Sequence, residues 1–333
     1  VDHTRQFLGA LDLFRRTTKL DISKISKFSF SWLGLAAILS VSGISFRLGS
    51  RLLETAQRYV DTEDVFSRMN NLVMSTITFH CQGAWDKIQD FDEDLMNAAL
   101  RIGDLFHAAN YLVFYGLVKG EQGEFGHLQK TIERTNAIGE TYAYNLAVLE
   151  TLELKSELFL KVGSVHKALV EAEKGVLLSR KHRSELHELI FLGYKAEAQQ
   201  LSGDAKGARA TIAQALQLHE KQSVMVLTIF MAPFLAARFF VDIEQLKQAL
   251  HSGDSPDMTP LRKQVYISGK AALNNARKYA PYRTKIFKLM GDYYWLIEKQ
   301  GKAIKWWSKA IKEGVRLGAH PDLSRTYFQV GKY

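Results

Sequence analysis

The sequence is poor in proline and in cysteine, and both shortages narrow the possible folds. The 333-residue chain has five prolines, and the first 232 residues contain none. Proline inside a helix costs roughly 3 kcal/mol, so a long proline-free stretch favours uninterrupted helices. Cys81 is the single cysteine. One thiol excludes an intramolecular disulfide framework and a cysteine-based zinc site, and we expect a reducing, cytoplasmic setting.

The motifs of common catalytic classes are also missing. The chain has neither a G-x-x-x-x-G-K-[ST] phosphate loop nor a G-x-G-x-x-G dinucleotide motif. Asp90, Asp92 and Asp94 alternate as at the start of a calcium loop. Leu95 and Arg101, however, stand where that loop needs glycine and glutamate. We therefore expect no enzymatic activity, no cofactor and no metal.

Charge gives a weaker indication. The chain carries 44 Lys and Arg residues against 35 Asp and Glu residues, a net charge of +9. Such an excess is compatible with nucleic acid or acidic lipid as a partner, but the basic residues are spread along the chain, as in a basic soluble domain. The sequence begins Val-Asp-His and ends within a helical pattern. We expect it to be a fragment of a longer polypeptide.

A regular repeat of glycine is the most informative feature that is present. Gly83, Gly123, Gly163 and Gly203 stand 40 residues apart, and a residue suited to helix packing follows each of them by five positions: Ile88, Leu128, Ala168 and Ala208. A fixed period of this length is typical of stacked helical hairpins, with glycine ending a helix at each turn. The sequence predicts an all-α superhelix, a single solenoid over residues 1–333, with a possible seam at 251–260.

One apolar run leaves two interpretations open. From Phe28 to Phe46 no residue is charged, and a run of this length can span a bilayer. The run also contains five serines, and Gly43 can split it into two shorter helices. A buried solenoid helix is favoured over a membrane span. Residues 1–20 are expected to form one helix, and the apolar stretch at 223–241 the central helix of a repeat.

The middle of the chain shows an amphipathic pattern. Apolar residues recur at helical spacing and mark one face, with three glutamates on the opposite side. The apolar residues are Leu146, Leu149, Leu152 and Phe159, and the glutamates are Glu150, Glu153 and Glu157.

The C-terminal part resembles tetratricopeptide repeats. Large and small residues alternate as in that pattern, at Phe287, Met290, Gly291 and Tyr294 and then at Ala303, Trp307 and Ala310. The stretches 289–297, 305–309 and 323–331 are similar to the tetratricopeptide region of large multidomain signalling proteins. The resemblance implies a regulatory, partner-sensing segment beside an AAA- or STAND-type ATPase and a cyclase or kinase module.

Two sets of residues are candidates for partner binding. The resemblance places Lys285, Lys288, Asp292 and Trp295 in the groove, where lysines can hold a peptide carboxylate. A second set, which we call the basic stripe, lies within one arc of a helix: Lys302, Lys305, Lys309 and Lys312. It is either a solvated face or a dock for phosphate, nucleic acid or an acidic partner.

The sequence thus favours a non-catalytic scaffold that binds a protein or peptide, including other domains of the same polypeptide. The alternative is a membrane-associated or nucleic-acid-binding helical domain that uses the 28–46 run or the basic stripe.

Overall fold

The computed structural model describes residues 8, 9, 12, 15, 16, 28–221, 227–252 and 257–332. Most of the helix expected over 1–20, and part of the expected seam at 251–260, lie outside these residues. The described residues form α-helices and two short 3-10 helices, and no strand. In chain order they are α2 (Phe28–Val41), α3 (Phe46–Gln57), α4 (Val65–Gln82), η2 (Trp85–Lys87), α5 (Glu93–Arg101), α6 (Leu105–Gln122), α7 (Phe125–Thr141), α8 (Asn145–Lys161), α9 (Val165–Lys181), α10 (Glu185–Leu201), α11 (Ala205–Lys221), α12 (Thr228–Ser252), α13 (Thr259–Arg277), η3 (Ala280–Tyr282), α14 (Arg283–Leu296), α15 (Gln300–Leu317) and α16 (His320–Val330).

The 40-residue period is present in the helices themselves. Helices α4, α6, α8 and α10 begin at residues 65, 105, 145 and 185, and α7, α9 and α11 begin at 125, 165 and 205. The four repeated glycines stand in the turns between paired helices, with φ between 76° and 90°. This left-handed conformation is the one that glycine adopts without strain, so the predicted helix ends are confirmed.

A second series of turns lies midway between the first. Gly103, Ala143 and Arg183 also have positive φ, at 77°, 49° and 53°. Helix and turn together therefore repeat every 20 residues across this region. The glycine spacing predicts only half of these turns, because two of the three residues in the second series carry side chains that rarely adopt this conformation.

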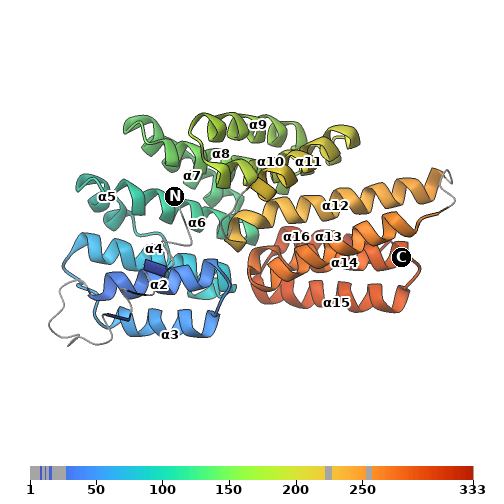
Figure 1. Ribbon diagram of the computed structural model, residues 1–333. Coiled ribbons are helices and arrows are strands. Elements are labelled where there is room, and N and C mark those ends of the chain that lie inside the picture. The colour runs from blue at the N-terminus through green and yellow to red at the C-terminus, as the bar shows by residue number, and fades with distance from the viewer. Residues whose placement is uncertain are drawn as a thin grey trace.

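Successive helices pack side by side into a superhelix (Figure 1). The chain runs from α2–α4 at the lower left, along α5–α11 at the top, and returns through α12 to α13–α16 at the lower right. The buried apolar residues form separate clusters along this path, and α8 contributes to two of them and α12 to three. The core is thus shared between neighbouring helices, as in a solenoid, and the predicted all-α superhelix is confirmed.

The apolar run at 28–46 forms the short helix α2 and the turn that leads into α3. Gly43 has a φ of 63° and separates α2 from α3. Leu33 and Leu39 of α2 are buried against Leu52 and Leu53 of α3. No helix among the described residues is both long enough and apolar enough to cross a bilayer. The expectation of a buried helix is confirmed for residues 28–41, and α12 likewise places most of the 227–241 stretch in the packed array.

Small residues let neighbouring helices approach closely. In α14 the space beside Gly291 is filled by the ring of Trp307 from α15, which confirms the alternation of small and large residues seen in the sequence. A Cβ atom at Gly193 of α10 would lie 2.5 Å from the backbone nitrogen of Phe234 in α12. Because that obstacle is backbone, it cannot rotate away, and the contact between α10 and α12 requires glycine here.

We therefore expect Gly193→Ala to destabilise the protein by about 1–3 kcal/mol through overpacking. Gly126→Ala is the matched control, since no atom lies within 4 Å of a Cβ at that helical position. It should be neutral or slightly stabilising. Urea denaturation followed by circular dichroism measures both. Equal stability of the two variants would contradict the close packing of α10 on α12.

Candidate functional site

A strip of carboxyl groups on α8 faces the inside of the superhelix. Leu154 and Leu158 pack in the cluster shared with α6 and α7, whereas Leu149, Leu152 and Leu160 pack in the cluster shared with α9–α12. Two sides of α8 therefore pack against neighbouring helices. The side between them, which faces the inside of the superhelix, carries Glu150, Glu153 and Glu157, which we call the glutamate strip. Glu150 and Glu157 are buried, so the face opposite the leucines seen in the sequence is an interior face.

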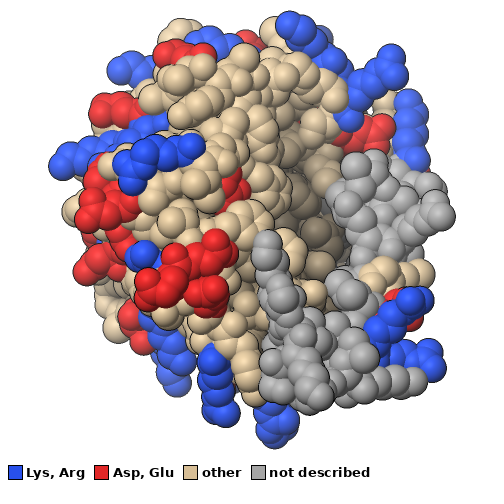
Figure 2. All heavy atoms as spheres, turned by 90° about the vertical axis from the view of Figure 1, so that its left-hand side faces the viewer, with Lys and Arg blue, Asp and Glu red and all other residues tan. Residues whose placement is uncertain are grey.

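The strip borders an apolar pocket of about 470 Å³. Its walls come from the inner faces of α2, α4, α6, α8 and α10 and from the start of α12. The residues that line it are Gly34, Ala37, Ile38, Val41, Met74, Ile77, Phe106, Asn110, Val113, Phe114, Leu117, Leu146, Glu150, Glu153, His187, Ile190, Leu227, Ile229 and Phe230. Figure 2 shows a hollow in one side of the molecule, with uncharged residues forming most of its visible wall.

The polar groups of the pocket are strongly desolvated. Burial, reinforced by the neighbouring Glu153, raises the pKa of Glu150 well above its usual range. Burial and the charge of Glu157 raise the pKa of Glu153 to about 8. Burial lowers the pKa of His187 to about 4, and its Nδ1 atom lies 2.7 Å from Ser184 Oγ. At neutral pH these side chains are therefore mainly uncharged.

The C-terminal helices close the other side of the superhelix by contacting the carboxyl ends of four successive inner helices. Arg316 donates to the carbonyl of Gly83 after α4 (3.0 Å), and His320 donates to Gln122 at the end of α6 (2.7 Å). Arg325 donates to Leu160 and Lys161 at the end of α8 (2.8 and 3.0 Å). Lys285 pairs with Glu197 near the end of α10 (2.6 Å). Basic groups here satisfy carbonyls that a helix leaves free and complement its dipole.

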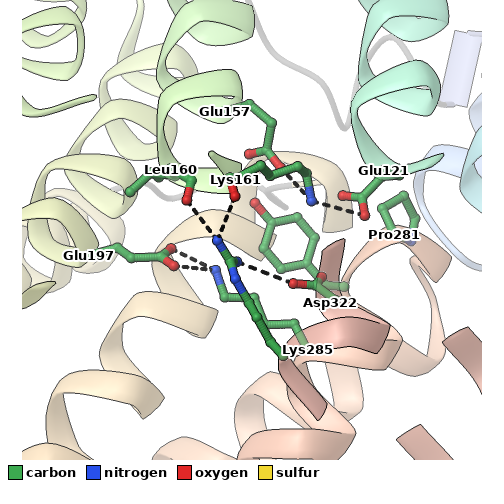
Figure 3. A pocket seen from close by; sticks show the side chains of 10 residues that line it. Glu121, Glu157, Leu160, Lys161, Glu197, Pro281, Lys285 and Asp322 are labelled. Carbon is green, nitrogen blue, oxygen red and sulfur yellow. Dashed lines mark hydrogen bonds and ion pairs between the residues drawn. The ribbon is translucent and has the colours of Figure 1, made fainter. Parts of the chain in front are cut away.

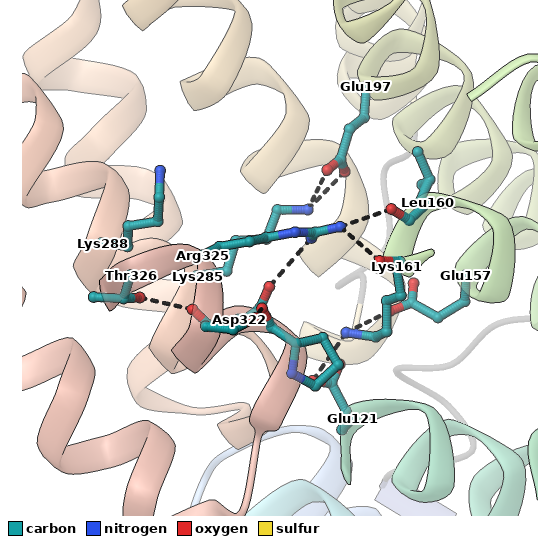
Figure 4. Close-up of polar contacts among 12 residues, drawn as sticks. Glu121, Glu157, Leu160, Lys161, Glu197, Lys285, Lys288, Asp322, Arg325 and Thr326 are labelled. Carbon is teal, nitrogen blue, oxygen red and sulfur yellow. Dashed lines mark hydrogen bonds and ion pairs between the residues drawn. The ribbon is translucent and has the colours of Figure 1, made fainter. Parts of the chain in front are cut away.

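Several of these residues belong to a central charge cluster (Figures 3 and 4). Its members are Glu121, Glu157, Lys161, Glu197, Lys285, Asp322 and Arg325. Lys161 Nζ lies 3.1 Å from both Glu121 and Glu157, and its side chain is only 5% exposed. Arg325 Nη1 lies 3.4 Å from Asp322 Oδ1. The cavity left among these side chains is about 10 Å³, which is room for about one water molecule.

The cluster as defined holds four carboxyl groups and three cations, so one carboxyl group is in excess. Burial raises the pKa of Glu121 to about 8, which makes Glu121 the group that keeps a proton at neutral pH. Asp322 behaves in the opposite way. Burial alone would raise its pKa, but the nearby Lys161 and Arg325 lower it. The balance of charge in the cluster thus depends on cations from the middle of the chain and from its C-terminal helices.

The predicted groove residues lie on α14. Lys285 belongs to the central charge cluster, and Lys288 pairs with Asp292 at 2.6 Å. Asp292 also accepts a hydrogen bond from Trp307 Nε1 (3.0 Å), and the Trp295 and Trp307 rings lie 5.5 Å apart. The structure therefore brings these residues together and pairs both lysines within the chain. Their assignment to partner binding stays a prediction.

The basic stripe lies on the outer side of α15. Lys302, Lys305, Lys309 and Lys312 are all exposed. Lys302 lies over the ring of Tyr294 and Lys309 over that of Trp306, at 5.5 and 4.5 Å from the ring centres. Its possible role as an anion dock also stays a prediction. Among the described residues, no group of three His, Cys, Asp or Glu side chains is placed to hold a metal ion.

The sequence analysis did not identify Glu150, Glu153 and His187 as site residues. A usable signal was present for the glutamates, because spacings of three and seven place them on one face of a helix. The missing information was that this face points into the superhelix.

Comparisons with known proteins place few limits on the function. No protein-family model matches the sequence, and no curated protein matches it. Among solved structures the chain is similar to the crystal structure of a Rap protein complexed with competence and sporulation factor. The TM-score is 0.44 and the sequence identity 10%, over 92% of this chain and 98% of the other.

We expect Lys161→Met to destabilise the protein by about 3–5 kcal/mol, because it leaves the buried Glu157 carboxylate without its cation and removes the hydrogen-bonding partner of Glu121. Lys174→Met is the matched control. Lys174 also pairs with a glutamate, Glu171, but its side chain is 58% exposed, so its loss should change stability by less than about 1 kcal/mol. Chemical denaturation measures both, and similar effects in the two variants would argue against a stabilising role for the cluster.

Glu153 makes stability depend on pH. Its pKa is raised from 4.5 to about 8 in the folded protein. Between these values the folded state binds more protons than the unfolded state, so stability falls as pH rises. Glu153→Gln removes this titration. We expect its stability advantage over the wild type to grow by about 3 kcal/mol between pH 5 and pH 8.

Denaturation curves at several pH values test this, with the exposed Glu54→Gln as the control. A constant difference between Glu153→Gln and the wild type across this range would show that Glu153 titrates normally.

Proposed function

We propose that the protein is a non-catalytic binding module that takes an apolar segment of a protein or peptide into the pocket on the inner face of its superhelix. The observation that carries this proposal is the pocket itself, a cavity of about 470 Å³ with almost entirely apolar walls. Apolar pockets with few polar groups are the usual binding sites of proteins, because removing apolar surface from water drives association.

The arrangement of the walls supports a ligand that several repeats hold at once. Ile77 comes from α4, Val113 from α6, Leu146 from α8 and Ile190 from α10, and each lies in an inner helix of a different unit. An extended segment that contacts all of them buries apolar area against four helices. Specificity then comes from the few polar groups at the pocket wall.

The resemblance of the C-terminal stretches to signalling proteins suggests the biological setting. In this proposal the module lies in the cytoplasm and binds a partner or a catalytic module of the same polypeptide, such as an ATPase, cyclase or kinase domain. Ligand binding would then regulate that domain. The superhelix provides a surface for such contacts, and the paired lysines of α14 lie at its inner side.

Filling the pocket tests the proposal. Gly34 lines the pocket, and a Cβ atom there has no atom within 4 Å, so Gly34→Leu introduces a side chain at the pocket wall. We expect it to lower the retention of peptides rich in Leu, Ile and Phe from a random library of capped heptapeptides by about tenfold or more.

The matched control is Gly126→Leu, which adds the same side chain at an exposed helical position with no atom within 4 Å. It should retain peptides as the wild type does. If the wild type retains no peptides above background, or Gly34→Leu retains the same ones, the pocket is not a peptide site.

A further inference from the structure

The carboxyl groups of the glutamate strip indicate which polar group a ligand of this pocket carries. Glu150 is 4% exposed, and its Oε2 atom has no hydrogen-bond partner. A buried carboxyl oxygen without a partner is unfavourable, and most such atoms in folded proteins are satisfied. Here the unsatisfied oxygen belongs to a residue that lines a cavity large enough for a ligand.

The described residues that line the pocket provide no cation for these carboxyl groups. None of them is Lys or Arg, and His187 is neutral because burial lowers its pKa to about 4. The glutamate that follows on the same helix does have a cation beside it. Glu157 has Lys161 at 3.1 Å, whereas Glu150 and Glu153 line the apolar pocket.

We propose that the pocket recognises a peptide segment in which a lysine or arginine side chain stands among apolar residues, the cation being held by Glu150 and Glu153. This rests on the proposed function and adds the charge of the ligand. The two residues lie three apart on α8, so their side chains are neighbours and can share one ammonium or guanidinium group. The apolar walls take the flanking side chains.

Binding must then release protons. Both carboxyl groups have raised pKa values in the free protein, and a cation beside them lowers these values again. The other titratable side chains that face the strip are His80 of α4, Glu121 of α6, Glu157 of α8, His187 and Tyr194 of α10, and Tyr279 and Tyr282 at η3. Burial lowers the pKa of both histidines and raises the pKa of the tyrosines further above 10, so these side chains stay neutral near pH 7, and burial raises the pKa of Glu121 to about 8.

The test uses three capped peptides, acetyl-Leu-Leu-X-Leu-Leu-amide, in which X is lysine, norleucine or glutamate. Titration calorimetry at pH 7 should show that the wild type binds the lysine peptide about tenfold more tightly than the norleucine peptide, and the glutamate peptide most weakly. The heat should differ between phosphate and Tris buffers, as expected for release of about one proton.

The double variant Glu150→Gln, Glu153→Gln keeps the shape of both side chains. It should bind the lysine and norleucine peptides equally and release no proton, while the exposed Glu54→Gln control behaves like the wild type. Octylammonium serves as a small amine for comparison. If it binds and the peptides do not, the ligand is a small molecule and the proposal fails.

The remaining outcomes separate the two proposals. Equal binding of the lysine and norleucine peptides by the wild type overturns the role of the glutamates but leaves an apolar peptide site in place. Failure of all three peptides, together with an unchanged Gly34→Leu variant in the library selection, removes the proposed function itself. Self-association of the wild type that the double variant loses, measured by light scattering, would assign the pocket to a second copy and overturn the inference.

Discussion

The inner face of this superhelix depends on the contact between the C-terminal helices and the carboxyl ends of α4, α6, α8 and α10. Those ends carry free carbonyls and partial negative charge, and the returning chain places Arg316, His320, Arg325 and Lys285 against them, one residue at each helix. In a solenoid whose repeats contact only their neighbours, the curvature can change along the length of the array. This row of contacts joins units far apart in the chain and so fixes the curvature that forms the pocket.

The same constraint explains why so much charge is buried. Removing a partner from a buried ion pair is strongly destabilising, whereas a complete cluster is tolerated because each group has a counterpart. The central charge cluster is nearly complete, with protonated Glu121 absorbing the excess negative charge. The glutamate strip shares Glu157 with this cluster. Its other two members, Glu150 and Glu153, continue the line of carboxyl groups along α8 into the apolar pocket, which no described Lys or Arg lines.

Much of the fold could be predicted from the sequence, because the repeat is local. A glycine that ends a helix acts within a few residues, so Gly83, Gly123, Gly163 and Gly203 marked their turns, and Gly43 marked the break between α2 and α3. The turns at Ala143 and Arg183 were missed because packing, and not residue type, imposes their conformation. The site was largely beyond prediction. Lys285 meets Glu197 across 88 residues and Arg316 meets Gly83 across 233, and no local pattern encodes such pairings.

In our proposal the selectivity of the pocket comes from the distribution of charge. The net charge of +9 is spread over the chain, with exposed lysines such as those of α15 on the outer surface, whereas Glu150 and Glu153, mainly uncharged at neutral pH, are the acidic residues that line the inner pocket. Long-range attraction therefore does not bring a basic ligand to the protein, and salt screens the outer charges. The attraction acts only after the ligand has entered a region of low dielectric, where ion pairs are strong. Glu157 is close enough to influence Glu153 and also pairs with Lys161. One carboxylate thus links the ligand pocket to the contacts that close the superhelix.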